Sequence, residues 1–316
     1  MEKEYTPLID RKESFDNVNK HFKEQTDLLV DLVNYGSNLL PRCFTMSNKG
    51  ITEVVVIGVL FKQALSMLDA FEVLFTNGVI QPSYLQTRAL FEVSWYMEYI
   101  LKEDSERRAK HYFVSNLRND RFWSLRGISG TKQKEKFDKI VSEFSENIIE
   151  EFSKFEADLV KQSDSIAETL QKDSFREINE SFEKIIKDRK LDYEPPWHTP
   201  LGLNSVRQVA NNIGKIHEYE TFYAFMSEAM HSSSLKAHVK LSSKEMSFEQ
   251  LRFLKNIKQI FSLTVSVTLR IYRLMLETYR PGEVKLFSKK YVEEWRKPFT
   301  EVKDVTYKYD DSPIKL

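Results

Sequence analysis

Apolar residues recur every three or four positions along most of the chain, which is the spacing of amphipathic helices. Because few of the 9 glycines and 9 prolines interrupt this periodicity, the helix ends are easy to place. We therefore expect an all-α fold, a multi-helix bundle. The pattern predicts helices over residues 14–40, 52–77, 83–102, 104–127, 204–212, 218–230 and 247–279.

Particular residues mark the predicted helix ends. Pro41 should end the first helix, because proline has no N–H group and clashes with the preceding turn. Ser83 with Gln86, and Ser247 with Gln250, match the capping box, in which each side chain bonds to the other residue's backbone N–H. These pairs therefore predict helix starts at 83 and 247.

The composition between residues 131 and 190 changes to mostly Lys, Glu, Asp, Ser and Phe. From Phe137 to Leu159, apolar residues three or four apart form one narrow stripe on a long charged helix, and a second helix over 164–189 returns. Together they predict a projecting charged helical hairpin arm. The same stripe also fits a dimer seam, and both interpretations stay open.

These patterns divide the chain into two halves of one bundle with an arm between them. Three prolines between 195 and 200 make the return from arm to bundle non-helical. The predicted parts are residues 1–128 (N-terminal half of the bundle), 129–192 (arm), 193–282 (C-terminal half) and 283–316 (a tail with one short helix at 289–295).

Composition removes several classes of protein. The 316 residues include 47 Lys plus Arg and 47 Asp plus Glu, so the net charge is zero, whereas a general electrostatic binder of nucleic acid shows a basic excess. With 41% hydrophobic residues the chain has enough apolar material for a core. The single cysteine, Cys43, excludes a disulfide framework.

No segment reads as a membrane span or a secretory signal. The N-terminus is charged throughout, and the uncharged apolar stretches at 54–61 and 259–269 are shorter than the roughly 18 residues that a span requires. The helix at 52–77 is apolar nearly all round, so we expect it at the centre of the bundle. A cytoplasmic protein without membrane contact is expected.

Arg88 and Glu92 lie four positions apart on the third predicted helix, and Trp95, Tyr96 and Tyr99 extend the same face. One interpretation is a polar site in an aromatic pocket, with Arg88 as an anion clamp and Glu92 as a base or orienting group. The other is an ordinary intrahelical ion pair, worth a few tenths of a kcal/mol if exposed.

Tyr219, Tyr223, Ser227 and His231 step by four residues down one helix face. Near the C-terminal end of that helix, the dipole would stabilise protonated His231, which suits an acid or a phosphate contact. The alternative is a histidine that only caps the last carbonyls.

Other chemistry has little support. The histidines are scattered without metal-binding spacing, and the chain lacks P-loop, dinucleotide-binding and nucleophile-elbow motifs, so no metal and no cofactor is predicted. Arg118, Arg121 and Arg126 with Trp123 form a basic, aromatic stretch that could meet RNA, or that is simply a solvated helix face.

Two segments resemble bacterial domain-of-unknown-function family 5677. They are Arg88-Ala-Leu-Phe-Glu92 with the aromatics to Tyr99, and residues 205–210 followed by Tyr219, Tyr223, Ser227 and His231. The resemblance covers residues 20–125 and 200–280 and leaves the arm as this protein's own elaboration. It implies an all-helical fold and no established reaction.

A looser resemblance is to HEPN ribonucleases, helical toxins and defence effectors that use an Arg, a short spacer and a His on one helix. Here the residues four to six positions before His231 are Ser227, Met226 and Phe225, so that Arg is missing. Arg88 would have to supply the charge from another helix.

Two hypotheses follow. In the first, the chain is a defence or stress effector acting on RNA or a nucleotide, with His231, Glu92 and Tyr223 as catalytic residues; Arg88, Tyr96, Tyr99 and Ser227 bind the substrate. In the second, the polar residues only fix helix register, and residues 131–190 form a homo-oligomer or recruit a protein partner. A small-molecule or nucleotide sensor is a third interpretation.

Overall fold

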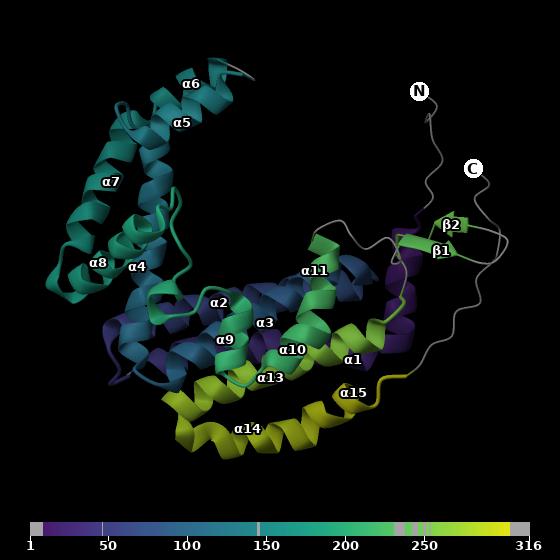
Figure 1. The fold of residues 1–316 in the computed structure, drawn as a ribbon. Helices are drawn as coiled ribbons and strands as arrows, with labels where there is room; N and C mark the ends of the chain where they lie inside the picture. The colour runs from purple at the N-terminus through teal and green to yellow at the C-terminus, as the bar shows by residue number, and fades with distance from the viewer. Residues whose placement is uncertain are drawn as a thin grey trace. The chain divides into compact units, whose positions relative to one another are not determined.

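The computed structural model describes residues 9–45, 47–143, 146–230, 238–241, 246–248, 251–252 and 254–303. These residues form helices and one small antiparallel hairpin, which confirms the predicted all-α class (Figure 1). The chain has two compact units. The first unit is Met1–Asn48, Ile57–Leu101 and Ala210–Leu316, and the second is Lys49–Val56 and Lys102–Val209.

The first unit contains most of the N-terminal helices together with the C-terminal third of the chain. The hairpin pairs Val239 with Phe248. The elements are α1 (Arg11–Phe44), α2 (Ile51–Thr76, in this unit from Ile57 onward), α3 (Ile80–Lys102), α10 (Ile216–Glu218), η3 (Tyr219–Tyr223), α11 (Ala224–Met230), β1 (Val239–Leu241), β2 (Met246–Phe248), α13 (Ile257–Tyr279), η4 (Pro281–Glu283), α14 (Val284–Lys290), η5 (Tyr291–Trp295) and α15 (Arg296–Thr300).

Aromatic and branched side chains fill the core of this unit. A Cβ atom at Gly36 of α1 would lie 2.3 Å from Leu65 Cδ2 and from the Tyr272 hydroxyl oxygen, so this close approach requires glycine. The Tyr272 hydroxyl donates to the Leu32 carbonyl at 2.6 Å, which ties α13 to α1. Fully buried core residues include Phe22, Leu29, Phe61, Phe71, Phe75, Trp95, Phe261 and Trp295.

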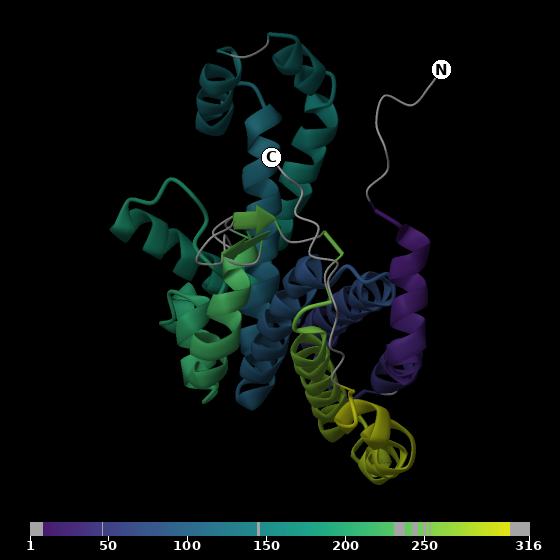
Figure 2. The same ribbon diagram turned by 90° about the vertical axis from the view of Figure 1, so that its right-hand side faces the viewer.

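The C-terminal helices pack along α13 and α1 (Figures 1 and 2). Trp295 donates from its indole nitrogen to the Asp31 carboxylate at 2.6 Å, and the Gln25 amide donates to the Pro298 carbonyl at 2.9 Å. Sequence predicted one helix at 289–295 here, whereas the structure is helical from Pro281 to Thr300. The tail is therefore longer in helix than the local pattern indicated.

Pro41 does not end the first helix, as the sequence predicted, because α1 continues to Phe44. In the last turn proline forfeits only its own N–H bond, and its carbonyl still accepts from the Thr45 N–H at 3.0 Å and the Thr45 hydroxyl at 2.8 Å. The helix ends predicted at residues 77 and 212 are confirmed to within one residue, and the glycines beyond them, Gly78 and Gly214, have φ near +70°.

The two predicted capping boxes are wrong. The third helix begins at Ile80, so Ser83 lies inside its first turn, where the buried hydroxyl donates to the Ile80 carbonyl at 2.6 Å. Ser247 lies in β2, and α13 begins at Ile257, because pairing with β1 takes the backbone groups that a helix would use.

The second unit is built around α4, with α7 and α8 packed against it (Figures 1 and 2). Its core joins Val114 to Ile166, Leu170, Ile178 and Phe182. The elements are α4 (Ser105–Ser124), η1 (Leu125–Gly127), α5 (Lys132–Val141), α6 (Glu146–Ser153), α7 (Glu156–Leu170), α8 (Asp173–Arg189) and η2 (Thr199–Leu201), and α9 (Val206–Asn212) follows at the unit boundary.

The long charged helix predicted from residue 131 onward is wrong, since four helices occupy the segment where two were expected. The predicted stripe therefore cannot form one continuous face. The second helix predicted for the arm, over 164–189, does pack through Ile178 and Phe182, but against α4 and α7 of the same unit. The unit thus includes residues 102–128 and 193–209 as well as the segment 129–192 that the pattern set apart.

The helix α2 is long and apolar enough to cross a membrane by length and composition, and 44% of its most apolar window is buried. A core helix passes the same test, so this is weak evidence of a span. One side of α2 is exposed, which corrects the expectation of a central helix. That side carries Lys62, Gln63, Ser66 and Asp69 together with the exposed apolar residues Val55, Val59 and Val73.

Candidate functional site

Arg88 of α3 is the centre of a polar cluster in the first unit. Its Nε donates to the Ser227 hydroxyl at 2.9 Å, and its NH2 donates to the Tyr223 hydroxyl at 2.6 Å. The guanidinium carbon also lies 4.3 Å from the centre of the Tyr223 ring, which is cation–π distance. Ser227 of α11 and Tyr223 of η3, both of which the sequence predicted as site residues, thus hold Arg88.

Glu92, one turn further along α3, completes this cluster. It accepts from the Tyr223 hydroxyl at 2.7 Å and from the Tyr96 hydroxyl at 3.1 Å. Its carboxylate lies 3.9 Å from Arg88 NH1, and the two side chains are 29% and 18% exposed. The pair is therefore more than the exposed intrahelical ion pair that was the alternative, because a tyrosine from another helix bridges it.

The Tyr223 ring is buried between aromatic neighbours. Its centroid lies 5.1 Å from that of Trp95 and 5.0 Å from that of Tyr219, on which it stacks. Burial and the hydrogen bond to the Glu92 carboxylate raise the pKa of Tyr223 well above its usual value. Tyr223 consequently stays protonated, donating to Glu92 and accepting from Arg88.

A π-helical turn sets the positions of these tyrosines. In η3 the Ala224 N–H bonds to the Tyr219 carbonyl, an i to i+5 bond that inserts one extra residue into the turn. Spacing in steps of four predicted a straight axial ladder. Tyr219 keeps this line by stacking on Tyr223, and its ring centroid lies 6.1 Å from that of Trp95, but it takes no part in the Arg88 hydrogen bonds.

A second polar network next to Trp95 was missed in the sequence. Arg270 of α13 forms an ion pair with Glu98 at 2.8 Å and donates to Glu218 at 2.5 Å, and the Trp95 indole donates to Glu218 at 3.0 Å. Although burial opposes it, the hydrogen bond and charge of Arg270 and the Trp95 hydrogen bond lower the pKa of Glu218. A charged residue directly after the apolar run 259–269 was the one available signal.

The remaining predicted site residues are placed differently. Tyr99 is buried further along α3, and the hydrogen bonds that join Arg88, Glu92 and Tyr223 do not include it. His231 lies outside the described residues. The structure therefore brings together Arg88, Glu92, Tyr96, Tyr223 and Ser227, and the roles given to them stay predictions.

This arrangement can bind an anion and hold a fixed hydrogen-bond donor. Among the described residues, Arg88 NH1 makes no hydrogen bond, since Glu92 at 3.9 Å is beyond hydrogen-bond distance. Two of its five N–H donors are used, and both bonds fix the plane of the guanidinium. NH1 faces the Glu92 carboxylate and keeps its hydrogen-bonding capacity among the described residues.

Other reactive groups do not add to this site. In the described part of the chain, no three His, Cys, Asp or Glu side chains gather as a metal site would require. Burial raises the pKa of the Cys43 thiol to about 12, so at neutral pH this cysteine is not a nucleophile.

The sequence matches the model of a family of unknown function, DUF5677, over residues 54–246, which is more than half of the chain. The matched range includes Arg88, Glu92, Tyr223 and Ser227, and it also runs through residues 131–190, which the resemblance had left to this protein alone. Among curated proteins and among solved structures, nothing matches the chain. The chain belongs to DUF5677, a family whose function is unknown.

Proposed function

We propose that the cluster around Arg88 binds the phosphate of a nucleotide or of RNA and acts on it. One observation carries this proposal: Arg88 is fixed by Ser227 and Tyr223 while its NH1 makes no hydrogen bond among the described residues. A guanidinium that is already oriented loses little further freedom on binding, and it matches the geometry of a phosphate.

The neighbouring residues support this assignment by holding Arg88 in place. Glu92 balances its charge, and Tyr223 links the two side chains through one hydroxyl. In the proposed reaction Glu92 and Tyr223 orient the acid or base His231, which stands four residues after Ser227 in the sequence. The resemblance to HEPN ribonucleases supports a defence or stress effector in the bacterial cytoplasm.

Charge at this site predicts how binding depends on salt. Arg88 with Glu92 is neutral as a pair, and the whole chain has no net charge. Affinity should therefore come from a few hydrogen bonds at one phosphate, with a slope of log K against log salt of about −0.7. A general polyanion binder would show a slope several times steeper.

Binding of adenosine monophosphate and of a single-stranded RNA oligonucleotide to the full chain tests the proposal. Arg88→Ala should weaken binding by roughly 10- to 100-fold, because charge-assisted hydrogen bonds are worth about 1.5–3 kcal/mol. Arg273→Ala is the matched control, since that arginine pairs with Glu277 on the exposed side of α13. Equal affinity in both variants would contradict a phosphate site at Arg88.

Cleavage of the RNA separates binding from catalysis. His231→Ala should abolish cleavage, leave RNA affinity unchanged, and leave the free energy of unfolding within about 1–2 kcal/mol. If the wild-type chain binds but never cleaves, the site is a sensor and His231 has no catalytic role.

Exposed apolar side chains favour a second candidate, a non-catalytic module that dimerises through residues 131–190. Ile140, Ile148 and Phe155 are 62%, 43% and 58% exposed on α5, α6 and the start of α7. Large apolar groups left in water are a feature of interaction surfaces.

Light scattering on the purified chain tests this candidate. Ile140→Gln with Phe155→Gln should turn a dimer into a monomer, because both side chains are exposed and their loss leaves the core intact. Val292→Gln, which replaces an exposed apolar residue of η5, is the control. A monomeric wild-type chain would exclude this function.

A further inference from the structure

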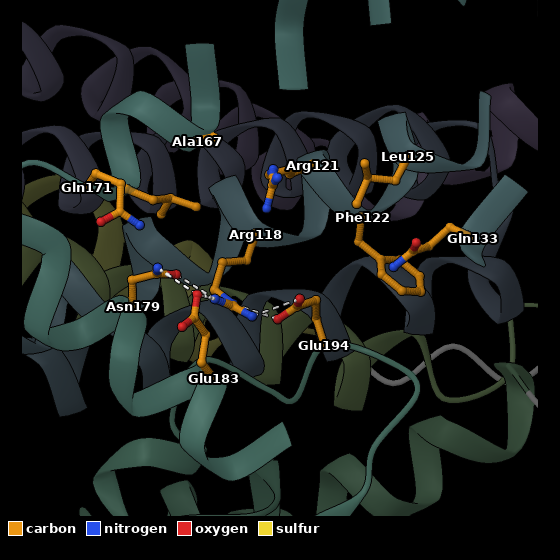
Figure 3. Close-up of a pocket in the computed structure, with 11 residues that line it drawn as sticks. Arg118, Arg121, Phe122, Leu125, Gln133, Ala167, Gln171, Asn179, Glu183 and Glu194 are labelled. Carbon is orange, nitrogen blue, oxygen red and sulfur yellow. Dashed lines mark hydrogen bonds and ion pairs between the residues drawn. The ribbon is translucent and has the colours of Figure 1, made fainter. Parts of the chain in front are cut away.

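The second unit contains a polar cavity of about 250 Å³ between α4, α7 and α8 (Figure 3). Its charged lining consists of two arginines from α4 and two glutamates, and amide groups supply most of the remaining polarity. The lining residues are Arg118, Arg121, Phe122, Leu125, Gln133, Ala167, Leu170, Gln171, Asn179, Glu183 and Glu194.

Arg118 is saturated by the walls of this cavity. Its Nε and NH2 donate to the two oxygens of Glu194 at 2.7 and 3.1 Å, which is a bidentate pair. Its NH1 donates to the Asn179 side-chain oxygen, and Glu183 lies 3.8 Å away (Figure 3). Both cavity carboxylates thus lie beside this one arginine.

Arg121, one turn later on α4, has none of these partners. Its Nε is buried without a hydrogen-bond partner among the described residues, and no interaction line reaches it in Figure 3. Arg270 also has one unpartnered nitrogen, but its charge is matched by Glu98 and Glu218. Arg121 has no such carboxylate in the described chain, and a buried donor left unpaired is costly.

The three arginines predicted as one basic stretch therefore have different surroundings. Arg118 is buried in ion pairs, and Arg126 stacks on the Trp123 ring with 3.8 Å between its guanidinium carbon and the ring centre. Only Arg121 faces the cavity without a carboxylate. This arrangement does not present a surface that follows a nucleic-acid backbone, and it favours a small ligand held in the cavity.

We infer that this cavity binds a small acidic metabolite whose carboxylate or phosphate group accepts hydrogen bonds from Arg121. The acid group would supply the acceptors that Arg121 lacks. The side-chain amides of Gln133 and Gln171, with the Phe122 ring, line the space left for the rest of the molecule. N–H or O–H donors of the ligand can bond to the outer lone pairs of Glu183 and Glu194.

Size and charge narrow the ligand further. A cavity of about 250 Å³ is just below the ~300–1,000 Å³ range of drug-sized ligands, so an amino-acid-sized or sugar-phosphate-sized molecule fits. The four charged side chains sum to zero, which disfavours a polyanion and suits a ligand that carries both an acid group and donor groups. This site is separate from the Arg88 cluster, so either can fail without the other.

Titration of the full chain with four probes tests the inference. Inorganic phosphate and glycerol phosphate represent the phosphate class, and acetate and alanine represent the carboxylate class, all at constant ionic strength. At least one probe should bind one to one and shift the Nε–H nuclear magnetic resonance signal of Arg121 more than that of Arg118, whose Nε–H already bonds to Glu194. The class that shifts it identifies the acid group.

Variants then tie binding to this arginine. Arg121→Gln should weaken binding at least ten-fold without lowering the melting temperature of the unliganded chain, because the buried Nε has no partner to lose. Arg107→Gln, at the exposed start of α4, should bind like the wild type. Arg121→Lys keeps the charge and should bind at an intermediate level, and it replaces the glutamine variant if that variant misfolds.

Two results would overturn the inference. One is an Arg121 signal that no probe of either class shifts up to about 10 mM, the weak end of specific affinity. The other is an affinity for the probe that stays unchanged in Arg121→Gln and Arg121→Lys, which would mean that the acid group of the ligand binds elsewhere.

Discussion

The cluster around Arg88 and the cavity around Arg118 use the same residue types in different proportions. Arg88 shares one carboxylate with two tyrosines, and its remaining bonds go to hydroxyls. Arg118 takes two carboxylates and an amide, so the neighbouring Arg121 has none. In the first case NH1 of the arginine itself makes no hydrogen bond among the described residues, and in the second case the neighbouring arginine has a buried Nε without a partner there.

This difference shows that an arginine cannot be assigned a role from its own position. A guanidinium saturated by carboxylates and an amide acts as a link between helices, as Arg118 does between α4, α8 and the loop at Glu194. A guanidinium held by hydroxyls, or left without acceptors, keeps the capacity to bind an anion. Substitutions at the two sites should therefore differ in stability and in binding.

Removing Arg118 should have the largest effect. Arg118→Gln leaves Glu194 as a charge without its partner in a mostly buried position, and such losses cost about 3–5 kcal/mol. Chemical denaturation should show this loss, and Arg176→Gln, at an exposed pair on α8, is the matched control. A loss below about 1 kcal/mol at Arg118 would mean that it is not the link between these helices.

Removing the Tyr223 hydroxyl should have a smaller effect. Tyr223→Phe takes one bond from Arg88 and one from Glu92, but both side chains are partly exposed, so water replaces some of the loss. We expect the free energy of unfolding to fall by about 1–2 kcal/mol. Tyr193→Phe, the same change at an exposed tyrosine of the second unit, should change it by less than about 0.5 kcal/mol.

The Tyr223 variant also tests the proposed binding. If Arg88 binds phosphate, loss of the hydroxyl that orients it should weaken nucleotide binding along with stability. A variant that is less stable but binds normally would make Tyr223 a structural residue only, and the comparison between the two sites would then rest on Arg88 alone.

Sequence periodicity predicted most helices of the first unit because their ends depend on local chemistry. The i, i+4 spacing of Arg88 and Glu92 also placed them on one face, and the spacing of Tyr223 and Ser227 placed those on another. That the two faces meet was a hypothesis that local spacing could not establish. The hydrogen bonds from Arg88 to Ser227 and Tyr223 show that the two faces meet.

The features that sequence reasoning missed depend on long-range packing. Glu98, Glu218 and Arg270 are far apart in the sequence, and no local pattern pairs them. The local sequence placed Arg121 on a basic surface, because the contacts that enclose it form only when α7 and α8 fold onto α4. Likewise, the capping signal at Ser247 was overridden by strand pairing, which a local motif cannot register.

Acid should destabilise the two units at different pH values, because each unit contains one group whose pKa is lowered by its surroundings. Burial lowers the pKa of His111 in the second unit below 6.5, and the Arg270 and Trp95 interactions lower that of Glu218 in the first unit below 4.5. Below its ordinary pKa each group is protonated more readily in the unfolded chain, so each unit loses stability as the pH falls past that value. The second unit should therefore weaken first.

Thermal melting between pH 5 and pH 7.5 tests this order, and the effect should be the smallest of the three. Of these two groups, His111 should contribute in that range, because Glu218 stays ionised in both states. His111→Gln removes the titrating group, so the melting temperature of the variant should depend less on pH, whereas Glu218→Gln should keep the wild-type slope there. If the Glu218 variant flattens the curve instead, acid acts on the first unit, and the assignment of these two groups is wrong.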